Sequence, residues 1–285
     1  MQSKCASDPA GQCPIAIASV SPTNSDVQMA SHWDSYPITE ALAIRAGDAT
    51  LLLDRADDDL QWHRRTEDAV TESLTCGPAG DISAIAADKW RRWSQGKRPD
   101  QILLRPAMPD LPVVFRPQMP LTLGGSSTCM IYIGIPVWLD CFADKAQPER
   151  RITLVPAFDL SKTWFGVNTA GRLGYALKTR ARRKLDDLET DVPMRAICTV
   201  ELNNTGHEPI PLDRVCLDCE HLTIFSDGTR LWTNPVTVSV SRASDPATVA
   251  HHPKPPKTAG KVHELVPARE PRSVIERVFT LGFGS

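Results

Sequence analysis

The sequence predicts an all-β protein built of two antiparallel β-sandwich-like domains with one short inserted helix. Between Met194 and Arg242, apolar and polar residues alternate in short stretches, as they do on half-buried strands. Turn-forming residues such as Asn203-Asn204-Thr205-Gly206 separate these stretches. The chain also has 24 prolines, which disfavour helix interiors and belong in loops and at strand ends. Short strands at this spacing are typical of a sandwich or barrel.

The N-terminal β domain is predicted to span residues 31–150, after a disordered tail of residues 1–30 that is rich in Ser, Pro, Asn and Ala. Three short strands are expected around Leu42, Leu51 and Leu60, with turns between them. Residues 81–94 predict the one helix, because Asp81 can cap it and its apolar residues recur at helical spacing.

The strongest strand pattern of the chain follows Gly124-Gly125. Every second residue from Cys129 to Cys141 is apolar, which gives one unbroken inward face. Because this is long for a single strand, we expect a bend near Gly134 or Pro136.

The C-terminal β-sandwich domain is predicted over residues 151–242, so the two domains divide near residue 150. It is followed by a Pro-rich linker at residues 243–272 and by a terminal strand or helix at residues 273–285.

Composition narrows the classes of function. The net charge is −2, so nothing in the overall balance favours nucleic acid as a partner. No segment approaches the roughly 20 apolar residues of a membrane helix, and no signal peptide is recognised, so we expect a cytoplasmic protein without membrane insertion. In that compartment the eight cysteines are expected to be reduced. The oligomeric state is left open.

One short motif suggests metal binding. Cys216, Cys219 and His221 resemble half of a zinc site, since thiolates and imidazole are its usual ligands. Against this, the sequence has no second C-x-x-C motif, and a spacing of three in a strand places the two cysteines on opposite faces. We therefore expect ordinary strand cysteines and no cofactor, with a metal site as the alternative.

A basic run follows at residues 178–184, where Lys178, Arg180, Arg182, Arg183 and Lys184 are cationic. Such a run could bind an acidic partner. The favoured interpretation is a solvated loop or a helix start, because four acidic residues follow between positions 186 and 191 and would repel the same anions.

No nucleophile elbow, phosphate-binding P-loop or H-E-x-x-H helix is present in the sequence. No residue can therefore be named as catalytic, and an enzyme of unidentified class is the last alternative. A ligand- or metal-binding sandwich is the first alternative, and a non-enzymatic interaction or regulatory module is the leading hypothesis.

Several segments together resemble the DUF432 family of bacterial and archaeal proteins. They are His32-Trp33, residues 102–114, residues 135–139, residues 163–166, residues 171–175 and Leu231-Trp232-Thr233. The resemblance covers about residues 32–242, with the last strand as a further candidate, and implies no activity and no catalytic residue. It implies a possible accessory role beside a small mechanosensitive channel, because genes of the family often lie next to one. Gly174 stands where we would expect a cysteine or similar residue, which weakens a role for a thiol there.

Aromatic and basic residues from these segments form the predicted partner-binding surface, since such residues are the usual anchors of protein interfaces. Filling the junction between the two sandwiches is an equally good role for the aromatic residues. The predicted surface consists of Trp164, Phe165, Arg172, Tyr175, Arg180, Arg182, Arg183 and Trp232.

Overall fold

The computed structural model describes residues 33–96, 99–166, 171–188, 194–242, 247–271 and 276–278. The predicted tail of residues 1–30 lies outside this part of the chain. Within it, all regular elements longer than one 3-10 turn are strands, so the all-β prediction is confirmed. The same residues contain no helix of the length and apolar character that a membrane crossing requires.

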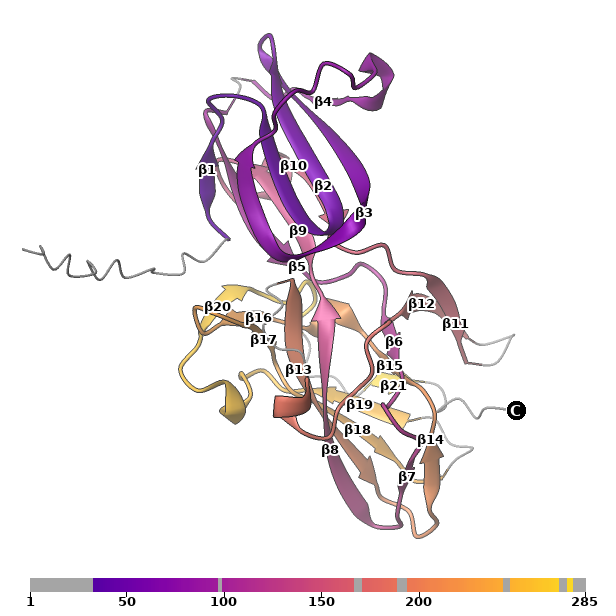
Figure 1. The fold of residues 1–285 in the computed structure, drawn as a ribbon. Coiled ribbons are helices and arrows are strands. Elements are labelled where there is room, and N and C mark those ends of the chain that lie inside the picture. The colour runs from indigo at the N-terminus through magenta and orange to yellow at the C-terminus, as the bar shows by residue number, and fades with distance from the viewer. Residues whose placement is uncertain are drawn as a thin grey trace, which may run out of the picture. The chain divides into compact units, whose positions relative to one another are not determined.

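Two sheets are built mainly from the first half of the chain (Figure 1). The first has the order β1-β5-β9-β10, with β1 at Ser35–Pro37, β5 at Gln101–Ala107, β9 at Trp138–Ala143 and β10 at Arg151–Pro156. The second has the order β2-β3-β4, with β2 at Leu42–Ala56, β3 at Asp59–Pro78 and β4 at Arg91–Trp93. All pairings in these two sheets are antiparallel.

The largest sheet is centred on β13, at Arg195–Asn204, which pairs with β8, at Ser127–Pro136, along its whole length. On its other edge β13 runs parallel to two strands, β17 and β18, so the sheet is mixed rather than purely antiparallel. Its remaining order is β20-β16-β17-β13-β18-β19-β21, with β16 at Ile224–Ser226, β17 at Leu231–Thr233, β18 at Val236–Val240, β19 at Ala247–His251, β20 at His263–Val266 and β21 at Glu276–Val278.

Two small sheets complete the strands of the described residues. One has the order β11-β12-β6-β15, with β6 at Val113–Phe115, β11 at Lys162–Phe165, β12 at Arg172–Ala176 and β15 at Val215–Leu217. The other pairs β7, at Leu121–Leu123, with β14, at Ile210–Leu212. Short 3-10 turns lie between strands: η1 at Ala87–Lys89, η2 at Pro148–Arg150, η3 at Leu185–Asp187, η4 at Cys219–His221 and η5 at Lys257–Ala259.

The strand pattern after Gly124-Gly125 folds as predicted. All seven alternate residues from Cys129 to Cys141 are buried. The expected bend is real, because β8 ends at Pro136 and β9 begins at Trp138. The chain thus leaves one sheet and enters another at Val137, whose backbone N–H donates to the Met194 carbonyl at 2.9 Å.

One contiguous cluster of buried apolar side chains runs through all five sheets. Leu51 of β2, Leu104 of β5, Val113 of β6, Ile133 of β8 and Ile210 of β14 are members, each at most 1% exposed. Burying an aliphatic side chain of this size stabilises the fold by roughly 1.5–3 kcal/mol. The sheets are therefore held on a shared core.

The turn predicted between the strands around Leu42 and Leu51 is a bulge inside one long strand. Gly47 has a φ of 60°, and the β2–β3 register shifts on both sides of it. A Cβ atom at this position would lie 2.0 Å from the Ala157 carbonyl oxygen, so only glycine fits. The first two predicted strands are consequently one strand, β2, which Figure 1 shows as part of the long β2–β3 hairpin.

The helix predicted at residues 81–94 is wrong. Asp81 accepts a hydrogen bond from the Ser83 backbone N–H at 2.9 Å, but the helix does not propagate beyond isolated 3-10 turns. Trp93 is buried as part of β4, which pairs with β3. The pairing of β4 with β3 therefore overrides the helical spacing of the apolar residues in this segment.

The Pro-rich linker predicted at residues 243–272 is also wrong. It contains β19 and β20, which pair with β18 and β16 in the largest sheet. The prolines at positions 253, 255 and 256 lie between these strands, where a missing N–H costs no ladder hydrogen bond. A terminal strand or helix was predicted at residues 273–285, and this segment includes a strand, β21.

The predicted boundary near residue 150 cuts through two strand pairings. β9 pairs with β10 across it, and β8 pairs with β13. Residues 31–285 form one compact unit.

Candidate functional site

Among the predicted aromatic anchors, Trp164 and Phe165 point to opposite faces of β11, as neighbours on a strand must. Trp164 is 45% exposed and stands opposite Leu173 of β12, which is 42% exposed. Phe165 is buried, with the Arg214 guanidinium carbon 5.7 Å from its ring centroid. Only Trp164 of this pair can therefore serve as a surface contact.

Trp232 and Tyr175 have largely internal roles. Trp232 is 2% exposed, and its indole N–H donates to the Asp227 carboxylate at 2.8 Å. Tyr175 is half-buried, donates its hydroxyl to Asp110 at 3.0 Å and lies with its ring centroid 6.0 Å from that of Trp138. Burial, and then the Asp110 carboxylate, raise the pKa of Tyr175 to about 12. These two residues do not form an exposed aromatic patch.

Arg172 stabilises the interior. Its guanidinium forms two hydrogen bonds with the Asp218 carboxylate, one of them 3.0 Å long, and Asp218 is only 3% exposed. A buried carboxylate without its partner is costly, so this arginine is fixed in place rather than offered to another molecule.

The basic run is an irregular loop whose residues Lys178, Arg180, Arg183 and Lys184 are exposed, as the solvated-loop interpretation expects, and its backbone is held by hydrogen bonds on both sides. Arg182 and Tyr132 exchange two backbone hydrogen bonds, of 2.9 and 2.8 Å. The Gln118 N–H donates to the Ala181 carbonyl at 3.0 Å, and the Ala181 N–H donates to the Arg116 carbonyl at 2.9 Å. The cationic side chains of this run consequently project from a defined backbone.

Two of the predicted arginines meet in a surface hollow of about 200 Å³, which we call the basic hollow. It is lined by Gly134, residues 178–180, Arg182, Leu188 and Arg195. Arg183 is not part of it, because its guanidinium donates to the Met130 carbonyl at 3.2 Å and contacts the Cys129 sulfur. The structure thus brings Arg180 and Arg182 together and separates Arg183 from them.

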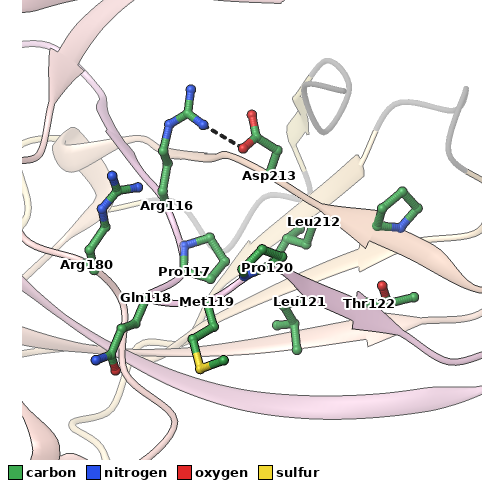
Figure 2. A pocket seen from close by; sticks show the side chains of 11 residues that line it. Arg116, Pro117, Gln118, Met119, Pro120, Leu121, Thr122, Arg180, Leu212 and Asp213 are labelled. Carbon is green, nitrogen blue, oxygen red and sulfur yellow. Dashed lines mark hydrogen bonds and ion pairs between the residues drawn. The ribbon is translucent and has the colours of Figure 1, made fainter. Parts of the chain in front are cut away.

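A second hollow, of about 420 Å³, adjoins the first and shares Arg180 with it. This proline hollow is lined by residues 116–122, Arg180 and residues 211–213. Figure 2 shows Arg116 and Arg180 at one end of its prolines, with Arg116 paired to Asp213 at 2.6 Å. Met119 is 73% exposed, so the hollow offers apolar surface beside a positive charge.

The residues of the proposed metal motif do not gather. Cys216 lies on β15, and both Cys219 and His221 lie in η4. Burial raises the pKa of the Cys216 thiol to about 12 and that of Cys219 well above its usual value, so both thiols are protonated at neutral pH. Across the described residues, no three His, Cys, Asp or Glu side chains are placed to hold a metal ion.

A separate cavity of about 480 Å³ contains two buried histidines that sequence reasoning did not connect. The rings of His221 and His251 meet edge to face with centroids 5.0 Å apart. His221 has its Nδ1 2.7 Å from the Glu270 carbonyl oxygen, so Nδ1 carries the proton. Burial, followed by the nearby His221, lowers the pKa of His251 to about 4. The sequence does contain a pattern that could have placed His251 in the core. Ala247, Val249 and His251 alternate with other residues, which predicts a strand with these three on its buried face.

These observations define an all-β protein whose candidate site is a pair of adjoining surface hollows, one apolar and one basic. The chain belongs to the DUF432 family, described as proteins of unknown function, and the family model matches residues 32–282. The resemblance inferred from the sequence is therefore confirmed, and the match extends beyond residue 242. No curated protein and no solved structure matches the chain.

Proposed function

We propose that this protein is a non-enzymatic, cytoplasmic interaction module that binds an acidic segment of a partner protein at the proline hollow. The observation that carries the proposal is the position of Arg180, which lines both the apolar and the basic hollow. An apolar anchor beside clustered arginines is the composition that energetically important interface residues favour.

The proline hollow supplies the apolar contact. Met119 and Leu121 line it together with prolines that are fixed in φ, so the backbone of the hollow loses little conformational entropy when a partner binds. Met119 adapts to irregular shapes because its side chain is unbranched and polarizable. A partner side chain of apolar character therefore fits this hollow.

Charge selects an acidic partner. No ion pair joins Arg180, Arg182 or Lys178 to a carboxylate of the described residues, whereas Arg116 is already paired with Asp213. Complementary charge at the rim mainly accelerates association, and salt screens it over about 8 Å at physiological ionic strength.

Trp164 lies on the hairpin β11–β12, which is joined to one wall of the proline hollow. The Arg214 guanidinium donates to the Trp164 carbonyl at 3.3 Å, and its neighbour Asp213 lines the hollow. An acidic segment on the cytoplasmic side of a membrane channel is the partner class to test first, since the family resemblance implies that neighbourhood.

Photo-crosslinking in the host organism tests the proposal. A photoreactive amino acid replaces Met119 in the full chain, and Val70, which is 58% exposed on β3, carries the same group as a matched control. We expect a discrete adduct from position 119, mapped by mass spectrometry to an acidic segment of one protein. Arg180→Ser should weaken this adduct severalfold and reduce its sensitivity to salt.

Equal adducts from positions 70 and 119 would contradict the proposal, as would no adduct from position 119. An adduct that maps to a basic or uncharged segment would retain the docking surface but overturn its acidic specificity.

A further inference from the structure

A further hollow, of about 350 Å³, shares no residue with the proline hollow or the basic hollow. We call it the tryptophan hollow. Residues of β3, η1 and β4 line one part of it, and residues of the edge strand β10 line the other. The lining residues are Trp62, His63, Arg64, Lys89, Arg91, Leu154 and Val155.

Strand pairing explains why a tryptophan and two arginines meet here. Trp62 stands opposite Leu53 in the β2–β3 ladder and opposite Arg91 in the β3–β4 ladder. Residues directly opposite each other in an antiparallel pair share a face, and Arg64, two residues beyond Trp62 on β3, shares it as well. Leu53 is fully buried, so this is the face that packs on the core. The two arginines consequently border the core rather than the outer face of the hairpin.

Trp62 and Arg91 supply an aromatic surface and a positive charge side by side. The guanidinium carbon of Arg91 lies 5.2 Å from the centroid of the Trp62 ring. Such a contact restrains the arginine without neutralising its charge. Leu154 and Val155 add aliphatic surface from β10. The hollow therefore combines apolar walls with a cation that is already positioned.

The ring of His63 attaches η1 to β3. Its Nδ1 lies 3.1 Å from the Lys89 carbonyl oxygen, and because a carbonyl can only accept a hydrogen bond, Nδ1 carries the proton. The same ring contacts that of Trp90, with centroids 5.9 Å apart. The backbone of Lys89 is thus fixed beside the hollow before any ligand binds, which reduces the entropy that binding must overcome.

Arg64 has one donor to spare. Its Nη2 donates to the Asp159 carboxylate at 2.7 Å, and its Nη1 donates to the Thr66 hydroxyl at 3.1 Å. Its Nε is buried and has no hydrogen-bond acceptor among the described residues. A buried N–H without an acceptor is costly, so an acceptor atom brought by a ligand would be stabilised here.

Lys89 and Arg91 are the cations of the hollow that lack a counterion. No carboxylate of the described residues forms an ion pair with either of them. Asp59 lies 3.9 Å from Arg92, which projects from the other face of β4. Residues 97 and 98 lie outside the described residues, and they are a lysine and an arginine, so neither carries a carboxylate.

We propose that the tryptophan hollow binds a small aromatic carboxylate, with the aromatic ring against the apolar walls and the carboxylate at Lys89 and Arg91. A neutral apolar ligand would remove water from two cations without replacing its hydrogen bonds, and a compact inorganic anion would leave the apolar walls uncovered. The planar fork of Arg91 matches the two oxygens of a carboxylate. A volume of about 350 Å³ lies within the roughly 300–1,000 Å³ of pockets for small organic ligands.

Isothermal titration calorimetry of the full chain with cinnamate tests the proposal. Cinnamyl alcohol keeps the aromatic body and lacks the charge, whereas acetate keeps the carboxylate and lacks the aromatic body. We expect cinnamate to bind on the order of tenfold more tightly than either compound, because only cinnamate satisfies both the cations and the apolar walls. No binding of cinnamate would overturn the site. Equal binding of cinnamate and the alcohol would overturn recognition of the carboxylate, and equal binding of cinnamate and acetate would overturn recognition of the ring.

Two neighbouring arginines provide a matched pair of variants. Arg91 and Arg92 are both exposed on β4, and only Arg91 lines the hollow. Arg91→Gln should weaken cinnamate binding by about tenfold, as the loss of a charge-assisted hydrogen bond does. Arg92→Gln should change it less than about twofold. Equal effects of the two variants would mean that cinnamate responds only to net charge, and the proposal would fail.

Two further variants complete the test. Trp62→Leu keeps an apolar side chain against the core and removes the aromatic surface, so it should weaken cinnamate binding severalfold while thermal denaturation shows a folded protein. Unchanged cinnamate binding in folded Trp62→Leu would contradict the proposed orientation of the ligand and overturn the site. Arg180→Ser, in the two hollows of the docking proposal, should leave cinnamate binding unchanged, so the two proposals can fail separately.

Discussion

Arg172 of β12 and Asp218, the residue before η4, form a bidentate ion pair between segments far apart in the chain. The side chain of Asp218 is 3% exposed and that of Arg172 is 36% exposed, so the carboxylate depends on the arginine for its hydrogen bonds. The pair therefore links the β11–β12 hairpin to the end of β15, an edge strand of the same small sheet.

Arg172→Met should destabilise the protein by about 2–3 kcal/mol. This is below the roughly 3–5 kcal/mol lost on breaking a fully buried pair, because Arg172 is partly exposed to solvent. Urea denaturation measures the loss. The double variant Arg172→Met/Asp218→Asn should recover part of it, since no unpaired charge remains. Equal stability of the single and double variants would show that the pair is not the source.

Ile133→Ala should lower the free energy of unfolding by about 2–5 kcal/mol, because its side chain is 1% exposed in the core and its removal leaves a cavity. Met130→Ala, on the other face of the same strand, is the matched control and should change stability by less than about 0.5 kcal/mol. Chemical denaturation of both variants makes the comparison. Similar losses at the two positions would mean that the inward face of β8 is assigned incorrectly.

Stability should fall on acidification because of His251. Burial, then His221 and His252, oppose its protonation, while Asp218 favours it, and the pKa falls from 6.5 to about 4. Its contribution is complete above pH 6.5, where the ring is neutral in both folded and unfolded chains. This stabilisation is lost as the pH falls from about 6.5 towards 4. The total loss of unfolding free energy for this pKa shift is about 3 kcal/mol.

His251→Gln should flatten the dependence of unfolding free energy on pH across that range, whereas His252→Gln, at the exposed neighbouring position, should reduce it only slightly, because His252 is the smallest of the named causes of the shift. Denaturation at a series of pH values provides the measurement. An unchanged slope in His251→Gln would assign the acid sensitivity to other groups.

The strands that could be predicted from the sequence are those whose side chains alternate between core and solvent. The pattern from Cys129 to Cys141 gave both strands and the bend between them, because one face is wholly buried. Residues 81–94 misled because their spacing suits a helix, while the pairing of Trp93 with Leu60 decides the structure. That pairing is between distant segments, so local propensity could not reveal it.

The candidate site was predictable in its charge and not in its shape. Arg180 and Arg182 were identified from a run of like charges, but the hollow also needs Gly134 and Arg195, which belong to strands distant in the sequence. Trp232 and Phe165 were misassigned to a surface because aromatic residues at strand ends suit both an interface and a core. The proline hollow gave no periodic signal.

The pairing of β8 with β13 has a consequence for how the chain acquires its structure. Each residue of β8 pairs with a residue that is synthesised later, from 59 residues later for Pro136 and Arg195 to 77 for Ser127 and Asn204, so the longest ladder of the largest sheet closes a long loop. Until then, the apolar face that contains Ile131 and Ile135 lies beside an unpaired strand edge, which is a template for association with other chains. Protein synthesis and chaperone access over that interval therefore bear on the yield of native protein as directly as the stability of the finished fold.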